Sequence, residues 1–152
     1  MRPVGFFKPS GNFSGNVDRW HHYYLYMPSI VIIDFGSANT SCNLKEDERH
    51  RGVRVFTVYF LTSLSETECI DCWMHLRNIE IDDEEVSGEM DEMFRLAFDE
   101  DKAVLEAMQQ ENLRPSNQQT ISLAMDKAPN VYRLRIKRMI ENELNKHRQR
   151  SY

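Results

Sequence analysis

The fold is decided by two neighbouring runs, GVRVFTVYFLTS at residues 52–63 and TECIDCWMHLRNI at residues 67–79. Both are rich in the β-branched and aromatic residues that strands favour, and the segment SLSE (63–66) joins them. Such a short connection predicts an antiparallel pair. Because strand side chains alternate between faces, one face of the first run holds Val53, Val55, Thr57 and Tyr59. The more apolar face of the second run holds Ile70, Cys72, Met74 and Leu76.

The sequence before this pair predicts a loop, two further strands and a second loop. Residues 1–16 hold two Pro, three Gly and two Ser and indicate an N-terminal loop. Residues 19–35, RWHHYYLYMPSIVIIDF, predict two strand segments separated by Pro28. Pro28 cannot donate to a sheet ladder, so it marks an edge, a bend or a bulge. The polar residues 36–51 predict a loop.

The hydrophobic period changes from two to 3.6 after Asp83, so helices follow the strands. Residues 84–112 predict one long helix, with a candidate break near Gly88. Residues 113–129 contain two prolines and predict a loop, and residues 130–148 predict the last helix. Its apolar stripe consists of Tyr132, Ile136, Met139, Ile140 and Leu144. Strands followed by helices indicate an α+β fold with an antiparallel sheet and long C-terminal helices.

Length and composition bound the class of protein. The chain has 152 residues, a mass of 18.0 kDa and a formal net charge of −5, which fit one domain and argue against sequence-independent nucleic-acid binding. No apolar run reaches the ~18 residues of a membrane span, and the N-terminus lacks the apolar stretch of a secretory signal. We therefore expect a cytoplasmic protein with neither a nucleic acid nor a membrane as its partner.

The charge is divided unevenly along the chain. Residues 1–79 carry eight basic and eight acidic side chains, residues 80–111 carry two and thirteen, and residues 112–152 carry nine and three, so the blocks net 0, −11 and +6. The middle block is too hydrophobic for a disordered acidic tail. It indicates a helix with a charged solvent face, followed by a basic helix lying near it. A sharper hypothesis is that one of the thirteen carboxylates does chemistry.

The three cysteines do not define a metal or redox site. Cys69 and Cys72 have the C-x-x-C spacing of zinc ribbons and redox motifs. On a strand, however, positions that differ by an odd number point to opposite faces, and Cys42 is the one other thiol. We interpret all three as reduced thiols without a special role.

Asp101 lies in the middle of an apolar helical stripe. On a wheel of about 100° per residue, the stripe consists of Met90, Met93, Phe94, Ala97, Phe98, Val104, Leu105 and Met108. A carboxylate on a core face is unfavourable by several kcal/mol unless it is compensated. Three compensations are open: Asp101 caps a restarted helix, pairs with a basic residue such as Arg135, or binds a metal ion.

The histidines do not decide between these alternatives. His21 and His22 are adjacent on a predicted strand and point opposite ways, and no H-x-x-H, H-x3-H or H-x4-H spacing occurs. A non-haem iron site of the 2-His-1-carboxylate type needs two imidazoles. The chain supplies no pair of this kind.

The ordered motifs of the chain resemble those of a known enzyme family. The run FDEDKAVLEAMQQ (98–110) resembles a motif near the C-terminus of Rieske-type non-haem iron aromatic-ring-hydroxylating oxygenases, in the branch of vanillate O-demethylase and dicamba O-demethylase. Residues 17–33 are similar to a strand pair of that catalytic domain, residues 61–67 to its hairpin turn, and residues 77–83 to its strand-to-helix junction. Residues 121–126 resemble the segment before its last helix. The resemblance covers about residues 17–145.

The resemblance implies a function and a set of site residues. It implies a portion of a helix-grip (START-like) domain that hydroxylates or oxidatively O-demethylates an aromatic compound with O₂, as a monooxygenase or dioxygenase of aromatic catabolism. Asp101 occupies the position of the carboxylate that binds the mononuclear Fe(II). Phe94 and Ala97, which precede Asp101 on the same helical stripe, would face the substrate.

The departures from the family pattern are equally informative. We expect neither of the two motifs, C-x-H and C-x-x-H, that hold a [2Fe–2S] cluster in the family, and the two iron-binding histidines expected upstream are missing. Residues 17–152 therefore predict the C-terminal part of a catalytic domain without its Rieske domain, with at most one of three protein ligands to iron. The expected partners are a Rieske-containing chain, a reductase and a small aromatic substrate, in an assembly that in the family is often a homotrimer.

Two other interpretations remain open at the level of sequence. One is a non-catalytic START-like binding domain that holds an apolar or aromatic ligand between sheet and helix, favoured by the missing ligands and by three methionines on the helix, Met90, Met93 and Met108. The other is an inactive remnant.

Overall fold

The structure is a computed structural model that describes residue 13, residues 15–114, residue 121 and residues 123–150. Four antiparallel strands form one sheet in the order β1-β2-β3-β4. Their bounds are Val17–Tyr26 (β1), Ile30–Asn39 (β2), Val53–Ser63 (β3) and Cys69–Arg77 (β4). The predicted α+β fold with an antiparallel sheet is thus confirmed. The prediction of a loop at residues 1–16 falls almost wholly outside the described residues.

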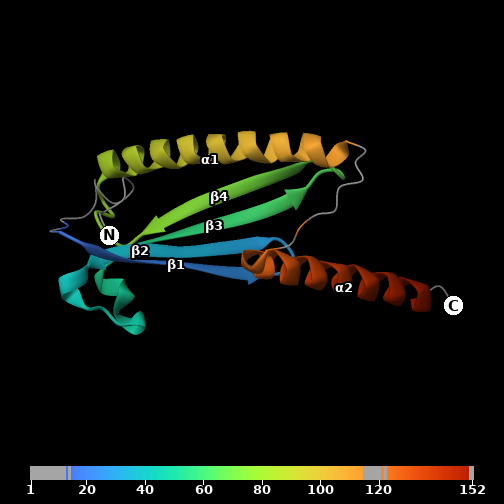
Figure 1. Ribbon diagram of the computed structural model, residues 1–152, viewed down its shortest axis with the longest axis horizontal. Coiled ribbons are helices and arrows are strands. Elements are labelled where there is room, and N and C mark those ends of the chain that lie inside the picture. Colours follow the sequence, from blue (N-terminus) through green and yellow to red (C-terminus); the bar gives the residue numbers. More distant parts are fainter. Residues whose placement is uncertain (1–12, 14, 115–120, 122, 151–152) are drawn as a thin grey trace.

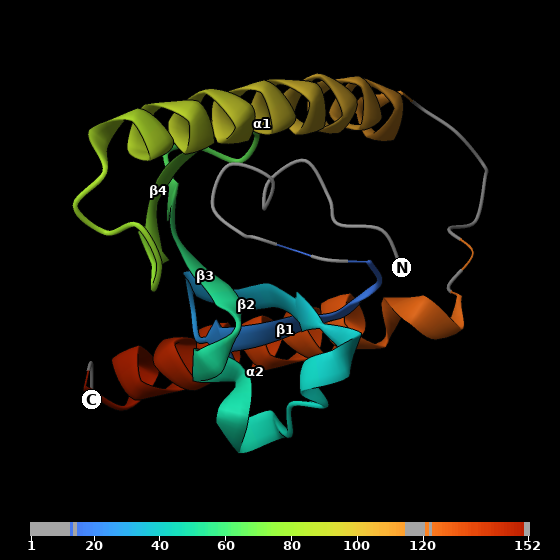
Figure 2. The same cartoon turned by 90° about the vertical axis from the view of Figure 1, so that its left-hand side faces the viewer.

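Two long helices lie on opposite sides of this sheet. Helix α1 spans Glu84–Leu113 and α2 spans Lys127–Arg150. Figures 1 and 2 show α1 over one face and α2 on the other side, at the end of the β1–β2 hairpin. The expectation that the acidic and basic helices lie near each other is therefore wrong, because the sheet separates them.

Helix α1 begins at a strong N-cap and continues without a break. The Asp83 carboxylate accepts a hydrogen bond from the Val86 backbone N–H at 3.0 Å, and Glu84 and Glu85 favour the positive end of the helix dipole. The helix passes through Gly88, where the space beside the backbone is open. The break considered near Gly88 is absent, because the turns on either side of this glycine bury Val86 and Met90 against the sheet.

The core lies between α1 and the face of the sheet toward it. Val53 and Val55 of β3 form one cluster with three buried residues of α1: Val86, Met90 and Phe94. These residues follow the two periods of the sequence, alternate positions on the strand and every third or fourth position on the helix. The predicted face of Val53, Val55, Thr57 and Tyr59 is thus the face that α1 covers.

The face of β4 that lies toward α1 is the less apolar of its two faces. Trp73 and His75 are half-buried and contact aromatic residues of α1. The more apolar face of β4 is exposed instead, at Ile70, Cys72, Met74 and Leu76. Tyr24, Tyr26 and Phe60 are exposed on the same outer face of the sheet. The number of apolar residues on a face therefore does not identify the inner face of β4, because the aromatic rings of Trp73 and His75 provide the packing there.

The predicted loop at residues 36–51 is partly wrong. Strand β2 continues to Asn39, and short 3-10 helices follow at Thr40–Cys42 and Glu46–Arg51. A side chain at Gly36 would collide with the ring of Trp20 and with the Val53 backbone. The small residues at the start of this segment admit close packing within the sheet and do not form a turn.

The remaining boundaries differ by a few residues. Pro28 lies in the turn between β1 and β2, which confirms the predicted bend. Helix α2 begins at Lys127 and not at residue 130, after a 3-10 turn at Ala124–Asp126. Pro129 is tolerated because it lies in the first turn, where its missing N–H would have no helical partner. Neither described helix is long and apolar enough to cross a membrane.

Candidate functional site

Asp101 lies on α1 close to an aromatic cluster on the sheet. The ring of Phe98, one turn before Asp101, contacts the rings of Tyr59 and Trp73 at centroid distances of 5.7 and 4.9 Å. Tyr59 and Trp73 are direct partners across β3 and β4. Asp101 is therefore on the sheet side of the helix, as the helical wheel predicted, but it is exposed to solvent.

Two of the three compensations considered for Asp101 are wrong. The helix is continuous from Glu84 to Leu113, so Asp101 is not an N-cap. Arg135 lies on α2, on the opposite side of the sheet, and forms no ion pair with Asp101. Among the described residues Asp101 makes neither a hydrogen bond nor an ion pair. Solvent compensates its charge in this chain, and the carboxylate remains available to a ligand.

Two carboxylates lie close enough to the aromatic cluster to raise the pKa of Tyr59. Burial raises the pKa of the Tyr59 phenol to about 12, and the negative charges of Asp71 and Asp101 add to the rise. The pKa of Asp71 is itself raised by burial. Half-buried rings and two carboxylates thus lie around the same end of the gap between sheet and helix. A cation or a flat apolar ligand suits such surroundings.

The two predicted substrate residues lie closer to the core than Asp101. Phe94 is 5% exposed, and its ring stacks on His75 at a centroid distance of 3.6 Å and meets Phe35 edge-on at 6.2 Å. Ala97 is half-buried. Phe94 forms the inner wall behind the aromatic cluster, and contact with a substrate remains a prediction for both residues.

His75 is held as a neutral imidazole within this wall. Its Nδ1 lies 2.8 Å from the Thr57 hydroxyl, and its Nε2 is buried with no partner in the described part of the chain. Burial lowers the pKa of His75 to about 4, against a smaller raising effect of Asp91. A proton is therefore strongly disfavoured on this ring at neutral pH.

The expectation that neither cluster motif occurs is wrong for one of the two, because Cys72 and His75 form such a pair. They have the C-x-x-H spacing of one Rieske ligand pair. His75 points toward α1, whereas Cys72 is exposed on the strand, and a C-x-H partner motif is absent from the sequence. All three cysteines are free and exposed, in agreement with their interpretation as ordinary thiols.

The donor set of this chain does not fit a mononuclear iron ion by itself. Within residues 15–114 and 123–150, no group of three His, Cys, Asp or Glu side chains could hold a metal ion. Affinity for Fe(II) rests on several nitrogen and oxygen donors together, and Asp101 offers one carboxylate. The structure thus shows one candidate ligand and no complete metal site.

The sequence identifies the family to which this arrangement belongs. Residues 2–142 match the family described as the vanillate O-demethylase oxygenase C-terminal domain. The chain belongs to this family. The expected resemblance is thereby confirmed over nearly the whole chain, and the sheet crossed by a long helix is consistent with a helix-grip domain.

Two curated relatives from Comamonas testosteroni support the same assignment. The putative toluene-4-sulfonate monooxygenase system iron-sulfur subunit TsaM2 is 27% identical over 137 residues, and the toluene-4-sulfonate monooxygenase system iron-sulfur subunit TsaM1 is 26% identical over 137 residues. Each alignment covers 90% of this chain but 40% of the relative. No solved structure matches the chain significantly.

Sequence reasoning missed Tyr59 and Trp73 as neighbours of Asp101. The sequence pattern puts Tyr59 on one face with Val53, Val55 and Thr57 but does not single out Trp73. Their cross-strand pairing follows from the β3–β4 register. The short connection could have indicated that register, because it fixes which residues of a hairpin lie opposite each other.

Proposed function

We propose that this chain is the C-terminal portion of the catalytic domain of an oxygenase that uses O₂ to hydroxylate or oxidatively O-demethylate an aromatic compound. The observation that carries the proposal is the place of Asp101. In a chain of this family, a carboxylate projects from the long helix beside an aromatic cluster without a protein partner. Because Asp101 has no hydrogen bond or ion pair to another described residue, its carboxylate can bind a ligand without breaking a contact within the chain.

In this proposal Asp101 supplies the carboxylate ligand of the mononuclear iron. The bound ion would supply the O₂ chemistry, and the two remaining protein ligands come from polypeptide outside this chain. The lengths of the relatives support this division, because the chain spans 40% of each of them. The Rieske cluster and a reductase belong to the partners, in a cytoplasmic assembly.

The aromatic cluster orients the substrate in the same proposal. Rings of Tyr59, Trp73 and Phe98 offer faces and edges on which an aromatic compound stacks. Ala97 leaves space on the helix, and Phe94 closes the inner end. Both curated relatives are named for the oxygenation of toluene-4-sulfonate, so an aromatic acid is the substrate class to examine first.

The iron content of a reconstituted complex tests the ligand assignment. The chain is co-purified with a polypeptide that carries the Rieske motifs and the paired histidines, and mononuclear iron is measured after separate quantification of the cluster. Asp101→Ala is expected to remove most of the mononuclear iron. Asp99→Ala, on the solvent side of the same helix turn, is the matched control and should retain it. Full occupancy in Asp101→Ala would contradict the assignment.

A ligand-binding assay separates the oxygenase from the binding module. Family membership favours the oxygenase. Thermal shifts with a panel of aromatic acids are measured for the chain alone and for the reconstituted complex, each with and without Fe(II). Stabilisation that appears only in the iron-loaded complex supports the oxygenase, whereas strong metal-independent stabilisation of the isolated chain would support a binding domain.

A further inference from the structure

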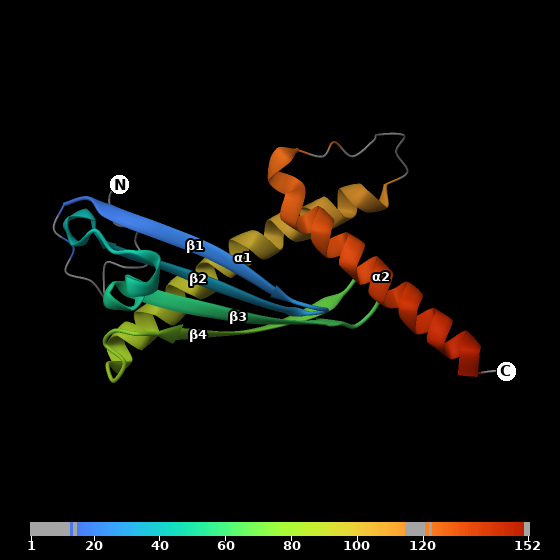
Figure 3. The ribbon, with the colours of Figure 1, turned by 90° about the horizontal axis from the view of Figure 1, so that it is seen from below.

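Helix α2 makes little contact with the rest of the chain. Of its 24 residues, Tyr132 and Ile136 are half-buried and the other described ones are exposed. The Tyr132 hydroxyl donates a 2.7 Å hydrogen bond to the Pro28 carbonyl, which ties the start of the helix to the β1–β2 turn. Figure 3 shows the rest of α2 extending beyond the strands.

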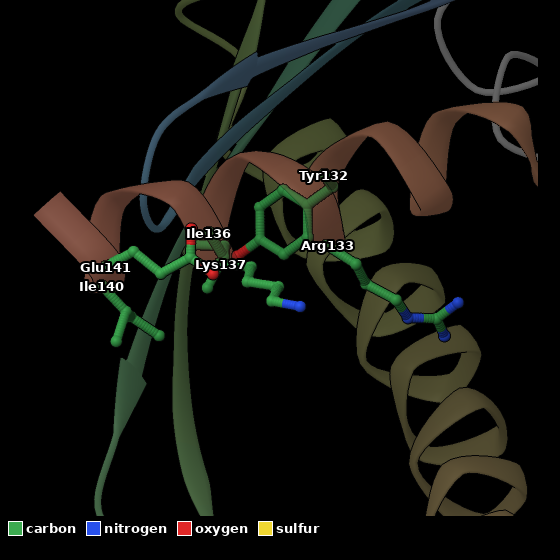
Figure 4. A pocket seen from close by; sticks show the side chains of 6 residues that line it. All are labelled: Tyr132, Arg133, Ile136, Lys137, Ile140 and Glu141. Carbon is green, nitrogen blue, oxygen red and sulfur yellow. The ribbon is translucent and has the colours of Figure 1, made fainter.

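The exposed part of α2 continues the apolar stripe that begins at this contact. Met139, Ile140 and Leu144 are 40%, 52% and 55% exposed. In Figure 4, Tyr132, Ile136 and Ile140 lie along a shallow groove that Arg133, Lys137 and Glu141 also line. Helical stability in proteins comes mainly from packing of the amphipathic face. A 24-residue helix with so little packing therefore calls for a partner surface.

The charge of α2 indicates the character of that surface. Residues 127–150 carry eight Lys or Arg and two Glu, a net charge of +6. Arg133, Lys137 and Lys146 flank the stripe and make no ion pair with any other described residue. A like-charged copy of α2 would repel it, so an acidic surface with exposed apolar residues is the better partner.

The outer face of α1 has these properties. Residues 84–113 carry ten Asp or Glu and two Lys or Arg, a net charge of −8. On the side away from the sheet, Glu85, Glu89 and Glu92 are exposed without ion pairs among the described residues. They continue into a low apolar strip formed by Leu96, which is 63% exposed, Ala103 and Ala107.

We infer that the apolar stripe of α2 docks on the acidic outer face of α1 in a second copy of this chain. Within one chain the two helices lie on opposite sides of the sheet (Figure 2), so the complementary surfaces meet only between copies. Because two different patches make the contact, it is heterologous and builds a ring or an open chain. The outer face of α1 is opposite to Asp101, so this association does not depend on the proposed metal ligand.

A charge-swap experiment tests the inference. Sedimentation velocity of the full chain at low salt is expected to show concentration-dependent association that weakens as salt is added. Arg133→Glu with Lys137→Glu should weaken association by about tenfold or more, as should Glu89→Lys with Glu92→Lys. Mixing these two double variants should restore association, because the opposite charges then face each other in the swapped sense.

Controls make every outcome decisive. Lys127→Glu with Arg138→Glu makes the same charge change on the far side of α2, where both residues are exposed, and should leave association unchanged, with circular dichroism confirming helix content in all variants. A monomer at every concentration, or a mixture of the swapped variants that stays monomeric, would overturn the inference. So would a monomeric chain that binds anionic phospholipid vesicles through α2, because the stripe would then serve a membrane surface.

Discussion

The two halves of α1 have the same hydrophobic period but different surroundings. From Val86 to Phe94 the apolar positions are buried against the sheet: Val86, Met90 and Phe94 are at most 9% exposed. From Asp101 to Leu113 the period continues, yet Val104, Leu105 and Met108 are 59%, 64% and 56% exposed. Figure 3 shows the cause, because α1 crosses the strands obliquely and its C-terminal half leaves the area they cover.

This difference separates a packed end of the molecule from an open end. The packed end comprises the first half of α1 and the strand residues it covers, and it defines the fold. The open end comprises residues 101–113 and the aromatic cluster beside Asp101. An exposed apolar stripe on a long helix indicates a surface that other polypeptide or a ligand covers. The candidate site therefore lies at the open end.

The largest expected effect comes from Phe94 at the packed end. Phe94→Ala removes a buried ring that packs on His75 and Phe35, and should lower the free energy of unfolding by about 3–5 kcal/mol. Met108→Ala, a matched large-to-small change at the open end, should alter it by about 0.5 kcal/mol or less. Urea unfolding followed by circular dichroism measures both. Similar decreases in the free energy of unfolding for the two variants would contradict the distinction between the packed and open ends.

A smaller effect is expected at Asp34, which anchors the sheet on its outer side. Asp34 is 1% exposed and accepts hydrogen bonds from Arg54 at 2.9 and 2.6 Å and from Trp20 at 3.2 Å. Asp34→Ala leaves Arg54 unpaired and should lower stability by about 2–3 kcal/mol at neutral pH. Arg51→Ala removes an exposed ion pair with Glu48 and should have almost no effect.

The pH dependence of that effect follows from the sign of the pKa shift. Burial alone raises the pKa of Asp34, but the hydrogen bonds from Arg54 and Trp20 outweigh it and hold the pKa below its ordinary value of 3.8. Stability from this group is therefore present above that value and is lost as the pH falls below it. The difference between wild type and Asp34→Ala should shrink in acid, and a constant difference would contradict the ion-pair account.

His75 should produce a second pH effect at the packed end. In the unfolded chain its imidazole takes up a proton near pH 6.5, whereas burial in the folded protein lowers its pKa to about 4. The unfolded state binds more protons between these values, so stability should fall as the pH drops from about 6.5 to about 4. His75→Phe keeps a ring against Phe94 and should flatten this slope in thermal unfolding. An unchanged slope would assign it to other groups.

The smallest effect is expected for Asp101 itself. Because its carboxylate is exposed and unpartnered, Asp101→Ala should change the stability of the chain by about 0.5 kcal/mol or less, with alanine favouring the helix slightly. Differential scanning fluorimetry measures this shift. A decrease of several kcal/mol in the free energy of unfolding would show that Asp101 has a structural role like the residues of the packed end.

Local patterns were sufficient for much of the fold. The alternation in residues 53–63 and the change of period after Asp83 predicted β3 and α1 to within a residue or two at their ends. The loop wrongly predicted at residues 36–39 and the undecided inner face of β4 share one cause. The small residues of β2 at positions 36–39 and the outward apolar residues of β4 are decided by neighbours distant in sequence, Trp20 in the first case and α1 in the second.

The candidate site, like the fold, was predicted from the sequence only in part. The wheel placed Asp101 on the inward stripe of its helix, and the resemblance to oxygenases gave that carboxylate a role. Neither could show that the helix leaves the sheet before Asp101 is covered. Nor could either show that Tyr59 and Trp73 lie beside it, because a helix period states which side a residue faces but not what lies there.

The sequence by itself determined the α+β order of elements, the family and the single inward carboxylate, because periodicity and motifs are properties of neighbouring residues. The tertiary structure alone decided which face of the sheet is inner, that Asp101 stays solvated, and that α1 and α2 lie on opposite sides of the sheet. Those outcomes depend on the crossing direction of α1 over the strands. That direction is set by the packing of Val55, Phe94 and His75 at contacts between residues far apart in the chain.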